Sequence, residues 1–188
     1  MKIAPLDRIL FDPVAWIHPQ QITIPAMFRQ GRCRSVINEV LRSKFQLPEP
    51  KAVPQEQGLT RFFIRHWPHL AQAAFLLCCQ RYRATLMRQG LYGRLPATVR
   101  QFMTLDLLPS CSLLQEAIIG REELSARMTY ELSGFEQQIA APLRPCLALL
   151  FPAQKSLQRD ARSVPAVDLL TLKLAIQHAQ RNASSFTV

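Results

Sequence analysis

Apolar residues recur at helical spacing along most of the chain, most densely between residues 67 and 89. Trp67-Pro68 predicts the start of this helix, because proline fits the first helical position, and Gly90 predicts a left-handed end. At roughly 1.5 Å per residue, about 22 residues would form a rod some 33 Å long. One stripe of it consists of Ala71, Phe75, Cys78, Tyr82 and Leu86. Its first half is apolar on every side and is therefore expected to lie among other helices.

Other segments show the same period. Helices are predicted near residues 33–45, 61–66, 96–105, 111–120, 121–140 and 164–180. The stripe of the first is Cys33, Val36, Ile37, Val40, Leu41 and Phe45, and that of the fifth is Leu124, Met128, Leu132, Phe135 and Ile139. The last helix is apolar on two sides, with Val167, Leu170 and Leu174 on one and Leu169, Leu172 and Ile176 on the other, so we expect it to be packed between neighbours. No convincing strand pair occurs. The pattern predicts an all-α fold, a single irregular multi-helix domain around a long central helix.

Segment boundaries follow from proline and capping residues. Asp12, Thr60 and Ser163 are expected to be N-caps, because each precedes a predicted helical turn. Residues 1–24 are expected to form an N-terminal turn segment. Residues 47–58 (LPEPKAVPQEQG) contain three prolines and no hydrophobic period, which predicts an exposed proline-rich surface loop. Residues 183–188 are expected to form a frayed tail. All belong to the one domain predicted over residues 1–188.

The chain is strongly basic. Lys and Arg number 23 against 13 Asp and Glu, a net charge of +10, and between Glu56 and Asp106 there are Arg residues but no acid. Such asymmetry predicts a positive surface that meets a negatively charged partner. The candidate partner-binding residues are Arg81, Arg83 and Arg88 first, then Arg61 and Arg65.

Nucleic acid is an alternative partner. Phe62, Phe63, Trp67 and Tyr82 are interleaved with these Arg residues, as in surfaces that track phosphates and stack on bases. Against this, the aromatic residues fall at the spacing of a helical core, and no familiar nucleic-acid-binding motif is present. A third reading is that several Arg side chains cap helix ends or lie over apolar neighbours.

Candidate chemistry is sparse. The five cysteines are odd in number and include the adjacent Cys78 and Cys79, which predicts free thiols packed in a core within a reducing compartment. His66 and His69 flank a proline that breaks their register, which disfavours a metal site, and His178 is expected to be a satisfied core or edge histidine. No P-loop, G-x-G-x-x-G, G-x-S-x-G or H-E-x-x-H motif occurs, and we expect no signal peptide, membrane span, cofactor, metal or small-molecule substrate. The sequence favours a non-enzymatic cytoplasmic protein.

Three blocks of sequence, residues 9–24 (ILFDPVAWIHPQQITI), 59–96 and 149–180, resemble the adaptor of the type III secretion sorting platform, the SctK family, in its OrgA and MxiK branch. The specific anchors are Phe11-Asp12-Pro13, His18-Pro19, Trp67, Arg88-Gln89-Gly90 and Leu150-Phe151-Pro152. The resemblance covers nearly the whole chain and is looser over residues 97–148. It implies a scaffold at the cytoplasmic face of the inner membrane that links the ring protein SctD to pods of SctQ, which carry the SctL stator and the SctN ATPase. It implies no catalytic residue and no cofactor.

Overall fold

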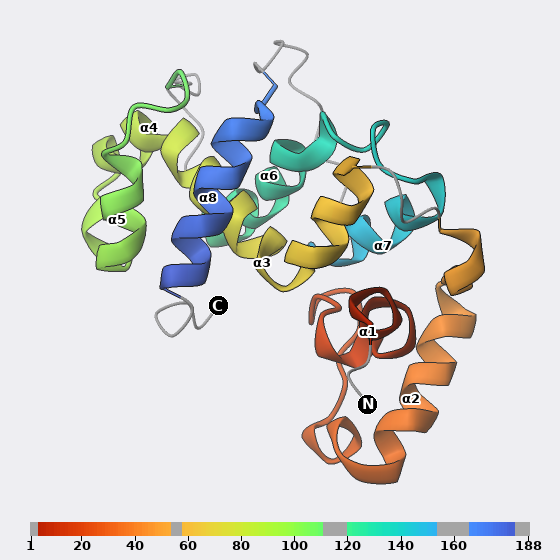
Figure 1. Ribbon diagram of the computed structural model, residues 1–188. Helices are drawn as coiled ribbons and strands as arrows, with labels where there is room; N and C mark the ends of the chain where they lie inside the picture. Colours follow the sequence, from red (N-terminus) through yellow and green to blue (C-terminus); the bar gives the residue numbers. More distant parts are fainter. Residues whose placement is uncertain (1–3, 54–57, 111–119, 154–165, 183–188) are drawn as a thin grey trace. The chain divides into compact units, whose positions relative to one another are not determined.

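The computed structural model describes residues 4–53, 58–110, 120–153 and 166–182 (Figure 1). Within these ranges the chain forms helices joined by turns and contains no strand, so the all-α prediction is confirmed. The α-helices are α1 Pro5–Phe11, α2 Gly31–Lys44, α3 Gly58–Arg81, α4 Arg83–Arg88, α5 Ala97–Met103, α6 Arg121–Ser133, α7 Arg144–Leu149 and α8 Leu169–Arg181. Short 3₁₀ turns are η1 Pro13–Ala15, η2 Ala26–Arg29, η3 Pro50–Ala52, η4 Tyr92–Arg94 and η5 Ala141–Leu143.

The chain divides into two compact units. The first unit comprises residues 1–68 and 135–153, and the second comprises residues 69–134 and 154–188. The boundary therefore falls at Pro68, within α3, and again directly after Gly134. The single domain over residues 1–188 stays a prediction.

Aromatic residues hold the first unit together. The rings of Trp16 and Trp67 meet edge to face with centroids 5.4 Å apart, and the Trp16 indole N–H donates to the Ile9 carbonyl over 2.9 Å. Phe63, fully buried on α3, packs against Phe135 with centroids 6.0 Å apart. Edge-to-face and tilted ring pairs of this kind add to the free energy gained by burying the rings themselves. The N-terminal segment is thereby fixed to α3.

Two predictions about the first unit's segments need correction. Residues 5–11 form the helix α1 within the predicted turn segment 1–24. In the predicted exposed loop 47–58, Leu47 and Val53 are buried and flank η3, so this part of the loop is packed, while residues 54–57 lie outside the described residues. Leu47 and Val53 stand among prolines and do not recur at helical spacing, so the sequence pattern gave no sign that they are buried.

The second unit is built on the later part of α3. This part is buried on every side, as the sequence predicts, through Leu70, Ala73, Ala74, Leu76 and Leu77. Cys78 and Cys79 are also buried, which confirms their packing role. His178 on α8 contacts the Thr98 carbonyl through Nε2 over 2.8 Å and packs on the Phe102 ring, so it is a satisfied histidine as expected.

The central helix differs from the prediction at its start. α3 begins at Gly58, merges with the predicted short helix over residues 61–66, and runs through Pro68. Proline removes one helical hydrogen bond and crowds the preceding turn, which makes an interior proline unfavourable without tertiary support. The buried side chains of Phe63, Trp67 and Leu70 on either side of it supply that support.

The other end of the rod agrees better with the prediction. Helical hydrogen bonding passes through a turn at Tyr82 into α4, and Gly90 follows with a φ of +66°. The Leu91 N–H donates to the Leu86 carbonyl and the Gly90 N–H to the Met87 carbonyl, the paired pattern that closes helices at a left-handed residue. Glycine adopts this conformation without a steric cost, so the predicted helix end is confirmed.

Capping residues were predicted less well. The helix after residue 58 already includes Thr60, whose buried hydroxyl accepts the Ala140 N–H over 3.0 Å. Ser163 lies outside the described residues, and α8 is instead capped by Asp168, whose Oδ1 accepts the Thr171 N–H over 2.8 Å. Asp12 does not cap η1. Thr60 and Asp12 instead accept hydrogen bonds from donors far away in the sequence.

We predict that Asp168→Ala lowers the free energy of unfolding by about 1 kcal/mol, the usual effect of losing an N-cap. The Thr171 N–H lowers the pKa of Asp168 below its ordinary 3.8, because it stabilises the ionised carboxylate. The cap's pH-dependent contribution is therefore fully present above pH 3.8 and is lost as the pH falls through the lowered pKa. Urea unfolding of the wild type and of Asp168→Ala, at pH values above and below 3.8, measures the effect. Asp168→Asn is the control and should keep most of the stability, since asparagine caps as well as aspartate; an equal loss in both variants would contradict the assignment.

Candidate docking surfaces

The five candidate Arg residues are divided between the two units. Arg61 and Arg65 lie in the first unit, on α3, and both are exposed. Arg81, Arg83 and Arg88 lie in the second unit, at the end of α3 and on α4. The structure therefore gives each unit its own set of candidate cations.

Arg81 is not available for docking, and its assignment to a partner surface is corrected. Its side chain is 1% exposed and that of Glu131 on α6 is 3% exposed. Arg81 Nε donates to Glu131 Oε1 and Arg81 NH2 donates to Glu131 Oε2, both over 2.8 Å. The two side chains therefore form a bidentate ion pair inside the second unit. The guanidinium of Arg81 thus joins α3 to α6 and does not reach a partner protein.

The carboxylate of Glu131 was given no role from the sequence. Burial raises the pKa of Glu131, and the hydrogen bonds and charge of Arg81 counteract only part of that increase. One signal was present: Glu131 lies three residues after Met128 and four before Phe135, within the predicted apolar stripe of α6. An acid on a buried helical face needs a buried cation.

A second missed group of side chains surrounds Tyr82. Arg127 of α6 pairs with Glu123 over 2.7 Å, donates to the Tyr82 hydroxyl over 3.4 Å, and lies over the Tyr82 ring. Burial raises the pKa of Tyr82, and the contacts with Arg127 partly offset that shift. These contacts hold the turn between α3 and α4 against α6. Their role is structural.

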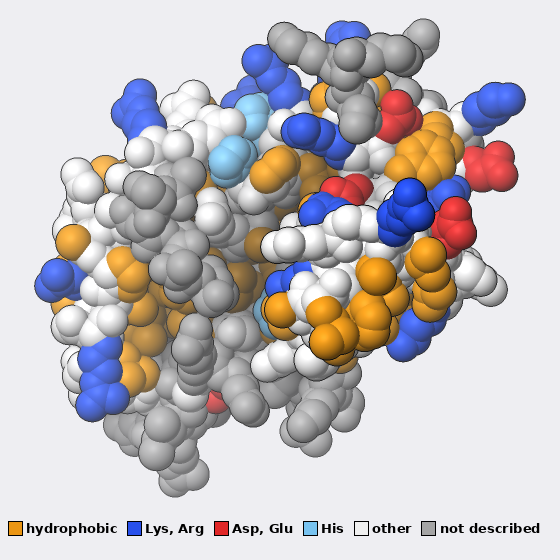
Figure 2. All heavy atoms as spheres, turned by 90° about the horizontal axis from the view of Figure 1, so that it is seen from below, with side chains coloured by type: hydrophobic (Ala, Val, Ile, Leu, Met, Phe, Trp, Pro, Cys, Tyr) orange, Lys and Arg blue, Asp and Glu red, His pale blue; other side chains and the backbone are white. Residues whose placement is uncertain are grey.

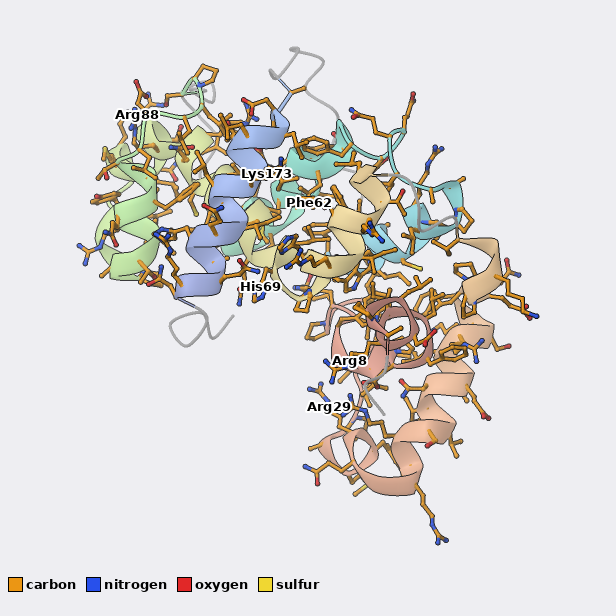
Figure 3. All side chains as sticks on the ribbon, viewed as in Figure 1. Arg8, Arg29, Phe62, His69, Arg88 and Lys173 are labelled. Carbon is orange, nitrogen blue, oxygen red and sulfur yellow. The ribbon has the colours of Figure 1, made fainter. Side chains whose placement is uncertain are left out.

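Arg83 and Arg88 remain candidates in the second unit. Arg83 NH1 donates to the Met103 carbonyl over 3.0 Å, and its NH2 lies 3.6 Å from the exposed carboxylate of Asp106. Arg88 is exposed near the end of α4 and donates to the Thr85 hydroxyl over 3.4 Å (Figure 3). A long pair with an exposed carboxylate contributes little stability and can be exchanged for a partner's acid.

In the first unit, Asp12 anchors α2. Its carboxylate accepts hydrogen bonds from Arg34 Nε over 2.8 Å and from Asn38 Nδ2 over 2.9 Å, and Asn38 Oδ1 in turn accepts the Val14 N–H over 3.0 Å. Burial alone would raise the pKa of Asp12, but the hydrogen bonds from Arg34 and Asn38 outweigh it and lower the pKa. This network determines which face of α2 turns inward.

The inward face includes only part of the stripe that the sequence predicted. Asn38 and Leu41 are buried, whereas Val36 and Val40 are 59% and 52% exposed and Cys33 is exposed as well. We define the α2 valine face as Cys33, Val36, Ile37 and Val40. Figure 2 shows apolar side chains gathered at the surface next to Lys and Arg side chains.

The last helix shows the same departure. The prediction that α8 is packed on two sides is only partly right. On the first predicted side Val167 is buried but Leu170 is 67% exposed and Leu174 is exposed, and on the second Leu172 and Ile176 are buried but Leu169 is exposed. The described residues thus leave one apolar stripe open on α2 and another on α8.

The described side chains give little chemistry beyond these surfaces. Burial raises the pKa of Cys78 and Cys79 well above the usual range and that of Cys146 to about 12, which keeps these thiols protonated and unreactive. Across the described ranges, no group of three or more His, Cys, Asp or Glu could hold a metal ion. No helix in the described part of the chain is both long and apolar enough to cross a membrane.

A family model and the similar proteins found by sequence comparison point to the same family. A family model described as "Bacterial type III secretion apparatus protein (OrgA_MxiK)" matches residues 6–181. The chain is 32% identical over 178 residues to the "Oxygen-regulated invasion protein OrgA" of Salmonella typhimurium strains 14028s, SL1344 and LT2, an alignment that covers 93% of this chain and 86% of each relative. No solved structure shows a significant match.

Proposed function

Because the chain belongs to the OrgA/MxiK family of bacterial type III secretion apparatus proteins, we propose that it is a non-enzymatic adaptor of the sorting platform. In this role it links the cytoplasmic domain of a SctD-type ring protein to SctQ-type pods, and through them indirectly to the SctL stator and the SctN ATPase. It acts at the cytoplasmic face of the inner membrane. The observation that carries the proposal is the family match over residues 6–181.

The surfaces of the two units support a protein that works by binding. Arg61 and Arg65 lie one helical turn apart on α3, so both can face one acidic surface. On α4 of the second unit, Arg88 is exposed and Arg83 is half-buried. An adaptor needs separate contacts for separate partners, and cations present in both units meet that need. Charges of this kind guide encounter and select partners more than they add affinity.

We predict that Arg61→Glu/Arg65→Glu weakens binding to an acidic partner by about tenfold and reduces the salt dependence of association, because the replaced side chains are exposed cations. The measurement is affinity for a purified SctQ-type protein and, separately, for the SctD-type cytoplasmic domain, at low and at moderate salt. Arg83→Glu/Arg88→Glu serves as the matched double variant in the second unit. Circular dichroism should stay unchanged in both. Wild-type affinity for both partners in the Arg61→Glu/Arg65→Glu variant would remove these two residues from the interface.

The same purified protein tests the proposed function against the nucleic-acid alternative. The adaptor is expected to bind at least one of the two secretion proteins and to leave nucleic acid behind at moderate salt. A chain that binds neither protein but keeps elevated absorbance at 260 nm and salt-dependent affinity for oligonucleotides would contradict the proposal.

A further inference from the structure

The α2 valine face has the pattern of a buried helical surface, but Cys33, Val36 and Val40 are exposed and Ile37 is only half-buried. Cys33 is three and four residues before Val36 and Ile37, and Val40 is four and three residues after them, so the four form one continuous stripe along α2. The Asp12 network holds α2 with Asn38 and Leu41 inward, which leaves the stripe on the outer side. Rotation of α2 to bury the stripe would break the hydrogen bonds from Arg34 and Asn38 to Asp12. The outward orientation is therefore built into the unit.

The residue types on this face indicate a packing surface. Valine and isoleucine are less favourable in helices than straight-chain residues, because a helix restricts their χ1 rotamers. An exposed helical position that touches nothing gains nothing from them. In contrast, β-branched side chains at intervals of three and four residues make a regular ridge against which another helix can pack. Three of the four members of the α2 valine face are β-branched or apolar aliphatic residues of this kind.

The charges around the face determine the kind of occupant. Arg32 stands at its beginning and Lys44 at its end, both exposed, with Glu39 along one border. A second copy of this chain fits poorly: an antiparallel pairing that sets Val36 against Val40 also sets Arg32 against Lys44, and a parallel pairing sets each cation against itself. The net charge of +10 opposes self-association further. A helix that carries acidic residues beside its apolar stripe meets both cations with opposite charge.

We propose that the α2 valine face is the docking site for an amphipathic helix, flanked by acidic residues, in another protein of the secretion apparatus. This inference deepens the proposed adaptor function and rests on it. Helix pairing of this kind buries the valines in the partner's apolar stripe, and Arg32 and Lys44 set its register and direction.

The direct test is a double variant of the full chain, Val36→Ser/Val40→Ser, titrated with the purified SctQ-type protein and with the purified SctD-type cytoplasmic domain. One of the two affinities is expected to fall at least about tenfold, since these side chains form the centre of the contact. Leu170→Ser/Leu174→Ser on α8 is the matched control, with comparable exposed apolar area removed, and should not weaken that same interaction. Both variants replace exposed side chains, so helicity and thermal unfolding should match those of the wild type.

A photo-crosslinking residue at position 36 identifies the occupant. Crosslinks are expected in one acidic, helix-forming segment of the partner whose affinity falls. Crosslinks to this chain's own residues, to a second copy, or to a segment without acids overturn the inference, as does unchanged affinity of Val36→Ser/Val40→Ser for both partners. In those cases wild-type binding still supports the adaptor function. A wild-type chain that binds neither protein overturns both.

Discussion

Glu131→Ala is expected to lower the free energy of unfolding by about 3–5 kcal/mol, because it leaves the Arg81 guanidinium charged and buried without its counterion. The two side chains are among the most deeply buried polar groups in the described part of the second unit. An exposed ion pair contributes far less, since water solvates each partner when the other is removed. Urea unfolding followed by circular dichroism measures the difference.

Two controls separate the buried charge from ordinary loss of packing. Glu123→Ala removes a less buried acid from the same helix and should cost about 0.5 kcal/mol, the usual effect of an i,i+4 pair. Arg81→Met/Glu131→Leu replaces the buried pair with apolar side chains and should restore stability to within about 1 kcal/mol of the wild type or exceed it. If Glu131→Ala proved as mild as Glu123→Ala, the buried pair would not be what joins α3 to α6.

Phe63→Ala is expected to destabilise the first unit by about 3–5 kcal/mol, because it removes a fully buried ring and leaves a cavity beside Phe135. The ring belongs to the part of α3 that packs on the residues after Gly134, two segments far apart in the sequence. Its loss therefore removes contacts that tie the chain's distant segments into one unit. Chemical denaturation with the tryptophan fluorescence of Trp16 and Trp67 reports on this unit directly, since both lie in it.

Phe62 provides the matched control one residue earlier (Figure 3). Its ring contacts Phe63 and His66 but is only partly buried. Phe62→Ala should cost about 1–2 kcal/mol, in proportion to the smaller apolar area that it withdraws from water. Equal losses in the two variants would mean that Phe63 is not central to the core of the first unit.

The sequence predicted where helices form better than it predicted which side of each helix is buried. Helical period and the absence of strand pairs were enough for the all-α fold, for the buried α3 and for the left-handed Gly90. The same period could not tell which side of α2 turns inward, because that choice depends on Asp12, more than twenty residues before Asn38. A stripe of apolar residues predicts a packing surface without saying whether the neighbour belongs to the same chain.

The sequence also gave a wrong role for the charge of Arg81, again because a distant residue decides it. Arg81 stands in a segment without acids, so its local sequence predicts an unpaired cation, but its counterion comes from fifty positions later in the chain. Proline rules failed at Pro68 because buried side chains on both sides compensate for the lost hydrogen bond. Arg88 is exposed and Arg83 is half-buried, so their role at a partner surface stays a prediction.

The most direct test of the adaptor function is size-exclusion chromatography of three purified proteins: this chain, a SctQ-type pod protein and the cytoplasmic domain of a SctD-type ring protein. We expect one complex that contains all three, and no complex of the pod and ring proteins when this chain is left out. Separate elution of this chain from both proteins at moderate salt would contradict the account.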